Sequence, residues 1–256
     1  MTAAVIPLPD GGFDMETALF PDLAANPAQA VRLLGGPVPQ TIHVPVWAFA
    51  IGTPDGWVLV DAGGGAMMGA GFGGVAGALA QAGIAAARII RVYLTHLHGD
   101  HCGGLLTADG KAAFPAARVA VPLAEMDYWT DNRASDIARD ALRALAPYAG
   151  RIETARPGDR IGAAYAIDAA GHTPGHMVWA LDAANVIAAG DIVHLPQVQI
   201  PQPGWGCVWD MDLLAATATR HRIMAMARQT GAALLCGHGG HLASALQPAQ
   251  RDVHGG

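Results

Sequence analysis

The run Thr-His-Leu-His-Gly-Asp-His at residues 95–101 places three imidazoles and a carboxylate close together in the chain. It follows an apolar segment, Ile89 to Leu94, that is typical of a buried strand. Because side chains alternate across an extended segment, the first two histidines are expected on one side of it, and the turn at the glycine lets the Asp-His pair reach a second position. Clustered imidazoles and carboxylates are typical metal ligands. The sequence therefore predicts a metal site at the end of a strand, with ligands for two ions.

The pattern of strands and helices predicts an α/β fold. Apolar runs of strand length recur along the chain, and several of them end at a His or an Asp. At 256 residues, the chain is expected to form one domain, residues 1–256, with a sizeable core. The expected strands are 46–50, 56–60, 89–94, 118–121, 164–168, 177–181, 186–189 and 233–236, and the expected helices are 75–82, 123–129, 135–145 and 213–229.

Charge and composition exclude several classes of partner. The formal net charge is -6, and the 15 Lys and Arg residues form no run, which argues against nucleic-acid binding. Residues 62–87 carry no charge, but their Gly and Ala content favours a loop and a buried helix over a membrane span. The three cysteines are widely spaced and odd in number, which favours free thiols. Since no signal-peptide pattern precedes Phe13, we expect a cytoplasmic protein without a membrane segment.

Three later segments add candidate ligands to the cluster. His172 lies in the run Gly-His-Thr-Pro-Gly-His, Asp191 follows an apolar strand in Gly-Asp, and His238 follows another apolar strand. His241 competes with His238 for the last position. His238 is favoured because it lies closer to the end of the preceding strand.

These motifs resemble those of the metallo-β-lactamase superfamily, in the same order, from about Ala48 to His238. The resemblance implies an αββα sandwich, two mixed β-sheets flanked by helices, with a dinuclear site at its edge. Zinc is the default metal, with Fe, Mn or Co as alternatives. Asp61 matches a position that commonly orients a histidine ligand in this family. The ligands implied are His96, His98 and His172 for the first ion, Asp100, His101 and His238 for the second, and Asp191 as a bridge between them.

The resemblance also implies a hydrolase. A hydroxide that bridges two ions would attack a carbonyl carbon or phosphorus, with Asp100 and Asp191 positioning or moving the proton. Residues 115–129 and 190–199 resemble the branch that contains methyl parathion hydrolase and quorum-quenching lactonases. We therefore expect hydrolysis of lactones or related esters, with N-acyl homoserine lactones favoured and phosphotriesters as a side activity. The family also suggests a homodimer.

Candidate substrate contacts are less sharply defined. His194 either faces the substrate or makes a structural hydrogen bond. Trp205 and Trp209 suit an acyl chain or an aromatic leaving group, and they are equally compatible with the core. The alternatives to a lactonase are a thioester or β-lactam hydrolase, a dinuclear iron redox protein that takes electrons from a flavin partner, and a metal-binding module without turnover.

Overall fold

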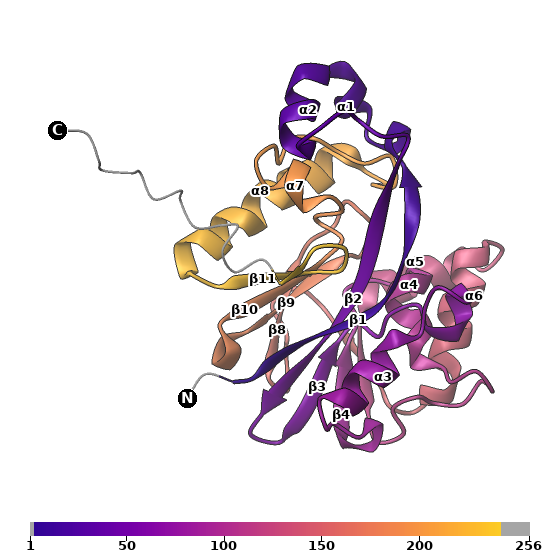
Figure 1. Ribbon diagram of the computed structural model, residues 1–256. Coiled ribbons are helices and arrows are strands. Elements are labelled where there is room, and N and C mark those ends of the chain that lie inside the picture. The colour runs from indigo at the N-terminus through magenta and orange to yellow at the C-terminus, as the bar shows by residue number, and fades with distance from the viewer. Residues whose placement is uncertain (1–2, 242–256) are drawn as a thin grey trace.

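Two six-stranded mixed β-sheets lie face to face in the computed structural model, which describes residues 3–241 (Figure 1). The strand order is β1-β2-β3-β4-β5-β6 in the first sheet and β12-β11-β10-β9-β8-β7 in the second. Helices α3 to α6 cover the outer face of the first sheet, and α8 covers the outer face of the second. The predicted αββα sandwich is confirmed.

The chain completes the first sheet before it begins the second. The first sheet consists of β1 (Val5–Glu16), β2 (Thr41–Thr53), β3 (Gly56–Val60), β4 (Ile89–Tyr93), β5 (Arg118–Pro122) and β6 (Ile152–Ala155). The second consists of β7 (Arg160–Ile161), β8 (Ala164–Asp168), β9 (Met177–Leu181), β10 (Val186–Gly190), β11 (Ala233–Cys236) and β12 (Gly240–His241). The α-helices are α1 (Pro21–Ala25), α2 (Pro27–Leu34), α3 (Gly74–Gln81), α4 (Gly99–Cys102), α5 (Leu123–Asp131), α6 (Asp136–Leu145), α7 (Pro196–Gln199) and α8 (Leu213–Thr230).

Alternating side chains divide the core into layers. In β3, Val58 and Val60 pack between the two sheets, whereas Leu59 packs under the helices of the first sheet. In β9, Trp179 lies between the sheets and Val178 faces α8. This follows from the two-residue repeat of a strand, because a sheet covered on both faces buries both sets of side chains. Each such aliphatic side chain contributes about 1.5–3 kcal/mol on burial.

The helix boundaries follow local capping chemistry. The Ser135 side chain accepts a hydrogen bond from the Ala138 N–H at the start of α6, and Asp212 does the same for Ala215 at the start of α8. Helix α8 ends at Gly231, whose φ of 68° suits glycine. These signals explain why the predicted helices at 135–145 and 213–229 agree closely with the structure.

Strand β1 was not predicted from the sequence. It pairs with β2 in an antiparallel register from Val5 opposite Ile51 to Glu16 opposite Thr41, and it forms the edge of the first sheet. It contains two prolines, which an edge strand tolerates because one side of its backbone has no partner strand. The register shifts between Pro9 and Gly11, which isolates Asp10 in a bulge. The other elements that were not predicted are strands β6, β7 and β12 and helices α1, α2, α4 and α7.

No helix within residues 3–241 is both long and apolar enough to cross a membrane. The uncharged segment 62–87 instead forms a glycine-rich loop that leads into α3.

Candidate metal centre

The candidate ligands lie where strands of both sheets end. The motif at residues 95–101 follows β4, and α4 begins inside it, with His98 as its N-cap residue. In the second sheet, His172 lies in the loop before β9, Asp191 follows β10 directly, and His238 follows β11. Strands β10 and β11 are parallel, so their ends carry Asp191 and His238 to the same edge. Segments from both sheets therefore meet at one end of the sandwich.

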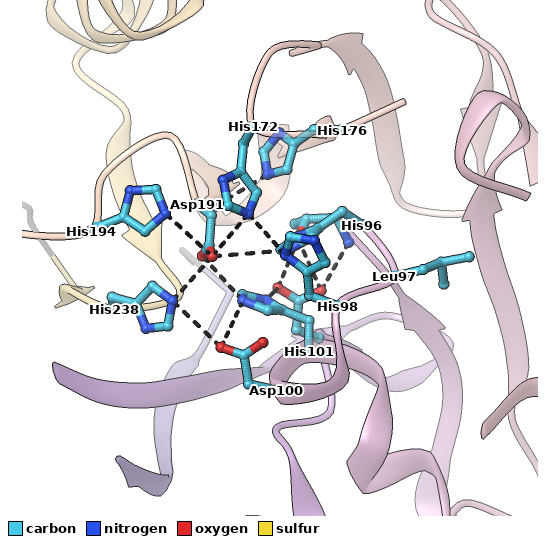
Figure 2. Close-up of polar contacts among 12 residues, drawn as sticks. His96, Leu97, His98, Asp100, His101, His172, His176, Asp191, His194 and His238 are labelled. Carbon is cyan, nitrogen blue, oxygen red and sulfur yellow. Dashed lines mark hydrogen bonds and ion pairs between the residues drawn. The ribbon is translucent and has the colours of Figure 1, made fainter. Parts of the chain in front are cut away.

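Two groups of ligand atoms converge around one shared carboxylate (Figure 2). Asp191 Oδ2 lies 3.5 Å from His172 Nε2 and 3.9 Å from His96 Nε2. The same carboxylate lies 3.1 Å from His101 Nε2 and 3.0 Å from His238 Nε2. Within each group, the ligand atoms all lie within 4.8 Å of one another. The first cluster is His96, His98, His172 and Asp191, and the second cluster is Asp100, His101, Asp191 and His238.

Buried atoms without partners fit a bound divalent ion. His96 Nε2, His101 Nε2 and Asp191 Oδ1 are buried and have no hydrogen-bond partner among the described residues. His98 Nδ1 and His172 Nε2 lie only 3.0 Å apart, so both point at the same place. A buried polar atom without a partner is costly, and a metal ion removes that cost. Imidazoles with carboxylates suit Zn, Fe, Mn or Co, so the residues present fit divalent metal ions.

His96 and His98 of the first cluster differ in protonation from His101 of the second. Burial lowers the pKa of His96 well below its ordinary value and that of His98 to about 3, so both rings are neutral, as a metal ligand must be. Burial also lowers the pKa of His101, but the carboxylates of Asp191, Asp100 and Asp61 outweigh it and hold that pKa well above its usual range. His101 therefore loses a proton when the second cluster takes up a metal ion, whereas the rings of His96 and His98 are already neutral.

Asp61, the predicted orienting residue, lies against a histidine of the second cluster. Its Oδ2 lies 2.9 Å from His101 Nδ1, and its Oδ1 accepts the Thr95 backbone N–H at 2.8 Å. Asp61 has a φ of 54°, a conformation that Asp tolerates better than most residues. Such a carboxylate fixes the tautomer and orientation of the metal-binding ring.

Asp210 and Arg220 act in the same way on the first cluster, and the sequence did not indicate them. Asp210 Oδ1 lies 3.2 Å from His172 Nδ1, and its Oδ2 accepts a hydrogen bond from Arg220 Nη2 at 3.2 Å. Both side chains of this ion pair are fully buried. Neither residue belongs to a recognisable motif, because Asp210 is distant from His172 in the chain.

Backbone groups hold other residues of the site. His238 Nδ1 lies 3.1 Å from the carbonyl oxygen of Pro45 in β2. His176 Nε2 accepts the backbone N–H of Asp191 at 3.2 Å, a role beside the ligands rather than among them. The structure therefore places His238 in the second cluster, while the side chain of His241 lies outside the described residues.

A pocket of about 680 Å³ opens onto the ligands. Its wall combines Asp100 and Asp191 with a mainly apolar lining. Another pocket, of about 750 Å³, lies between α3 and residues 104–114 and contains none of the candidate ligands. The apolar side chains around the metal pocket are Phe13, Met68, Tyr128, Trp129, Ile137, Trp209 and Met211.

The three predicted substrate contacts lie in different environments. Trp209 lines the pocket. Trp205 does not: it packs in a core cluster with Phe20 and Val198, and its carbonyl oxygen accepts hydrogen bonds from the buried Gln199 and Arg220 side chains. That position corrects the prediction for Trp205. His194 is fully buried behind Asp191, with its Nε2 3.8 Å from Asp191 Oδ2 and its ring stacked on that of His238.

A family comparison agrees with this sandwich fold. The family model described as the metallo-beta-lactamase superfamily matches residues 42–238, which is most of the chain. The chain belongs to the metallo-β-lactamase superfamily. The match begins in β2 and ends at His238, so it contains every predicted ligand of the superfamily site.

Solved structures of the superfamily superpose closely on the chain. The hydrolase AbOPH is 28% identical with a TM-score of 0.84, over 91% of this chain and 86% of its own. AidC, a dizinc quorum-quenching lactonase in complex with a product, is 23% identical with a TM-score of 0.82, over 93% and 88%. A mutant of AiiA from B. thuringiensis, with N-decanoyl-L-homoserine bound at its active site, is 16% identical with a TM-score of 0.66, over 93% and 94%. No curated protein matches the chain significantly by sequence.

The superfamily and the site together define the protein as a metal-dependent hydrolase. Its His and Asp clusters lie at the ends of strands from both sheets, and their nitrogen and oxygen atoms suit divalent ions.

Proposed function

We propose that the protein is a dinuclear hydrolase that opens lactones or cleaves related esters, with zinc as its metal. The single observation that carries this proposal is the position of Asp191, whose carboxylate belongs to both ligand clusters. A carboxylate that belongs to both groups of ligand atoms could hold two ions at the short separation typical of two-metal sites. In this proposal Asp191 would help to hold both ions, and the other six candidate ligands would hold one ion each as the two clusters divide them. N-acyl homoserine lactones are the favoured substrates.

The protein's own side chains would position the reacting groups. Bound divalent ions would supply an activated water and polarise the substrate carbonyl. Asp100 lines the pocket beside Asp191, and its Oδ2 lies 3.5 Å from His238 Nε2 and 3.6 Å from His101 Nε2. From this position the Asp100 carboxylate can accept the proton of the attacking water and later return it to the leaving alcohol. Asp100 and Asp191 are therefore the proposed catalytic carboxylates.

The pocket wall favours neutral, apolar substrates. Aromatic and aliphatic side chains line it, while Asp136 and Asp140 of α6 add carboxylates at its wall. None of the described residues that line it is a Lys or Arg. A β-lactam or another anionic substrate would bring its carboxylate to a wall without a cationic partner, which is unfavourable. An uncharged acyl lactone with an apolar chain avoids this cost, and a phosphotriester, which is also uncharged, fits as a side substrate.

A substrate panel tests the proposal. Metal-reconstituted protein is assayed on N-acyl homoserine lactones, aryl esters, a phosphotriester, a thioester and a β-lactam, and its metal content is measured in parallel. We expect two ions per chain, with lactones turned over fastest. Asp100→Asn should lower kcat by about 100-fold or more, because a general base contributes about 10²–10⁴-fold. Asp127→Asn, an exposed change on α5, is the matched control and should leave the rate unchanged.

The panel also separates the alternatives. Faster turnover of the thioester or the β-lactam than of any lactone would assign the pocket to that substrate class. If two ions bind and nothing in the panel reacts, the substrate assignment fails. Binding of a single ion with full activity would refute the dinuclear mechanism.

A further inference from the structure

Glu125 is a fully buried carboxylate that belongs to neither ligand cluster. It lies in α5, and no Lys or Arg within residues 3–241 forms an ion pair with it. Its partners are three N–H groups instead. Its Oε2 accepts the Leu97 backbone N–H at 3.1 Å and the Trp129 indole N–H at 2.8 Å, and its Oε1 accepts the Gly175 backbone N–H at 2.9 Å. A buried carboxylate is kept in a core only when such donors satisfy it.

The two backbone donors belong to the loops that carry the first cluster. Leu97 lies between His96 and His98, and its side chain points away from the ligands that flank it (Figure 2). Gly175 lies three residues after His172 in the loop between β8 and β9. One loop follows β4 of the first sheet and the other precedes β9 of the second, so Glu125 joins segments that share no strand pairing.

The loop of Gly175 also lies directly against the start of α5. A Cβ at position 175 would overlap the backbone of Glu125 and Ala124, so only glycine permits this approach. The hydrogen bond from Gly175 to Glu125 is therefore supported by close packing. A small shift of Glu125 would move both loops relative to each other.

We propose that Glu125 is a positioning residue that sets the spacing of the first-cluster imidazoles and thereby the affinity of that cluster for its ion. This inference rests on the proposed dinuclear site. The second cluster is held by other contacts, from Asp61 to His101 and from the Pro45 carbonyl to His238. Loss of the Glu125 contacts therefore weakens the binding of an ion in the first cluster and leaves an ion in the second cluster in place.

Glu125→Gln isolates this role with almost no change in shape. A carboxylate offers acceptors only, whereas a glutamine amide places N–H₂ where one oxygen stood. Since every partner of Glu125 is a donor, either orientation of the amide sets one donor against another. The two loops then lose at least one of their common anchors.

Asp10→Asn is the matched control. Asp10 is also a buried carboxylate satisfied by backbone N–H groups, those of Gly64, Gly65, Gly73 and Val75. The chemical change is the same, and the cost in folding stability is expected to be similar. Those four N–H groups belong to the glycine-rich loop and α3, not to a loop that carries ligands.

The experiment measures the metal itself. Zinc-loaded wild type and variants are titrated with a chelator, metal content is followed at each step, and histidine-ring ¹⁵N spectra identify which imidazoles remain bound. In Glu125→Gln we expect the first-cluster ion to bind about 10–100-fold more weakly, as for other residues that orient metal ligands. His101 and His238 should keep their metal-bound resonances. In Asp10→Asn both ions should dissociate as in the wild type.

Trp129→Phe decides the matter if Glu125→Gln does not fold. It removes one donor and keeps the carboxylate and both backbone anchors, so a smaller loss confined to the first ion is expected. The proposal would be overturned if the variant lost affinity for both ions equally. It would also be overturned if Asp10→Asn lost as much affinity for the first-cluster ion as Glu125→Gln does. A wild type that binds only one ion in total would instead contradict the dinuclear function. The affinity of that ion, and the ring resonances of His96, His98 and His172, would then still show whether Glu125→Gln weakens metal binding.

Discussion

Asp61 and Asp210 hold two different imidazoles through the same kind of contact. Each carboxylate lies against the Nδ1 atom of a histidine whose Nε2 faces the metal centre, Asp61 against His101 and Asp210 against His172. The contact selects the tautomer that leaves Nε2 free to bind a metal ion. The two carboxylates differ in their other partners, so substitution has different consequences at the two positions.

Replacing Asp61 by Asn should weaken metal binding by the second cluster with little strain in the backbone. Asn also tolerates the φ of 54° at this position, so the change removes an acceptor without disturbing the turn. The affinity of the second cluster for zinc should fall about 10–100-fold. Chelator competition with metal analysis measures this, and an unchanged affinity would show that Asp61 does not orient His101.

Replacing Asp210 by Asn should cost folding stability as well as metal affinity. The change leaves the Arg220 guanidinium buried without its charge partner, and breaking a buried pair in this way costs about 3 kcal/mol. Urea unfolding of the metal-free protein measures the loss. Asp212→Asn at the exposed N-cap of α8 is the control and should cost well under 1 kcal/mol, because Asn caps about as well as Asp. Equal losses would contradict a special role for the buried pair.

At the level of elements, one carboxylate relieves repulsion across three parallel strands. Arg91 in β4 lies opposite Arg118 in β5, and Glu153 in β6 binds both, with each Nε 2.9 Å from a carboxylate oxygen. Burial raises the pKa of Glu153, but its hydrogen bonds to the two arginines outweigh that effect and lower it. Without Glu153, two like charges face each other on neighbouring strands.

The lowered pKa of Glu153 predicts a pH dependence. A carboxyl group whose pKa is depressed by folding stabilises the protein above its unfolded pKa of about 4.3, and this stability is lost as the pH falls through the folded value. Glu153→Gln should therefore lower the free energy of unfolding by about 1 kcal/mol at neutral pH. The difference from wild type should shrink in strongly acidic solution. Urea titrations at both pH values test this, with Glu16→Gln at the exposed end of β1 as the control; a difference independent of pH would argue against the ion pairs.

For the molecule as a whole, the metal centre joins the two sheets. Its ligands come from the end of β4 in the first sheet and from the ends of β10 and β11 in the second. Metal bound there would therefore stabilise the sandwich across the plane between the sheets, in addition to the core of Phe49, Tyr93 and Trp179.

Removal of the metal should lower the melting temperature. A ligand present at about 1,000 times its Kd stabilises the folded state by about 4 kcal/mol, which corresponds to roughly 10 °C for a chain of this size. Calorimetry with and without chelator measures the shift, and added zinc should restore it. An unchanged melting temperature on verified loss of metal would show that the ligands are held in place by the protein alone.

The sequence by itself determined the fold class and the candidate ligands. Both depend on local patterns: alternating apolar residues predict strands, and the ligands lie within a few residues of the strand ends, as the motif at 95–101 does after β4. The location of His172, Asp191 and His238 near later strands was accessible for the same reason. Strands, and the residues that follow their C-terminal ends, can be predicted from neighbouring residues alone, without knowledge of distant contacts.

Only the tertiary structure decided which residues support those ligands. Asp210 reaches His172, and Glu125 reaches Leu97 and Gly175, across large separations in the chain, and no local pattern encodes such pairs. The tertiary structure also placed Trp209 at the pocket and Trp205 in the core, although the sequence treats the two alike. The physical reason is that the burial and partners of a side chain depend on how separate elements pack, whereas strand and helix patterns depend on neighbours along the chain.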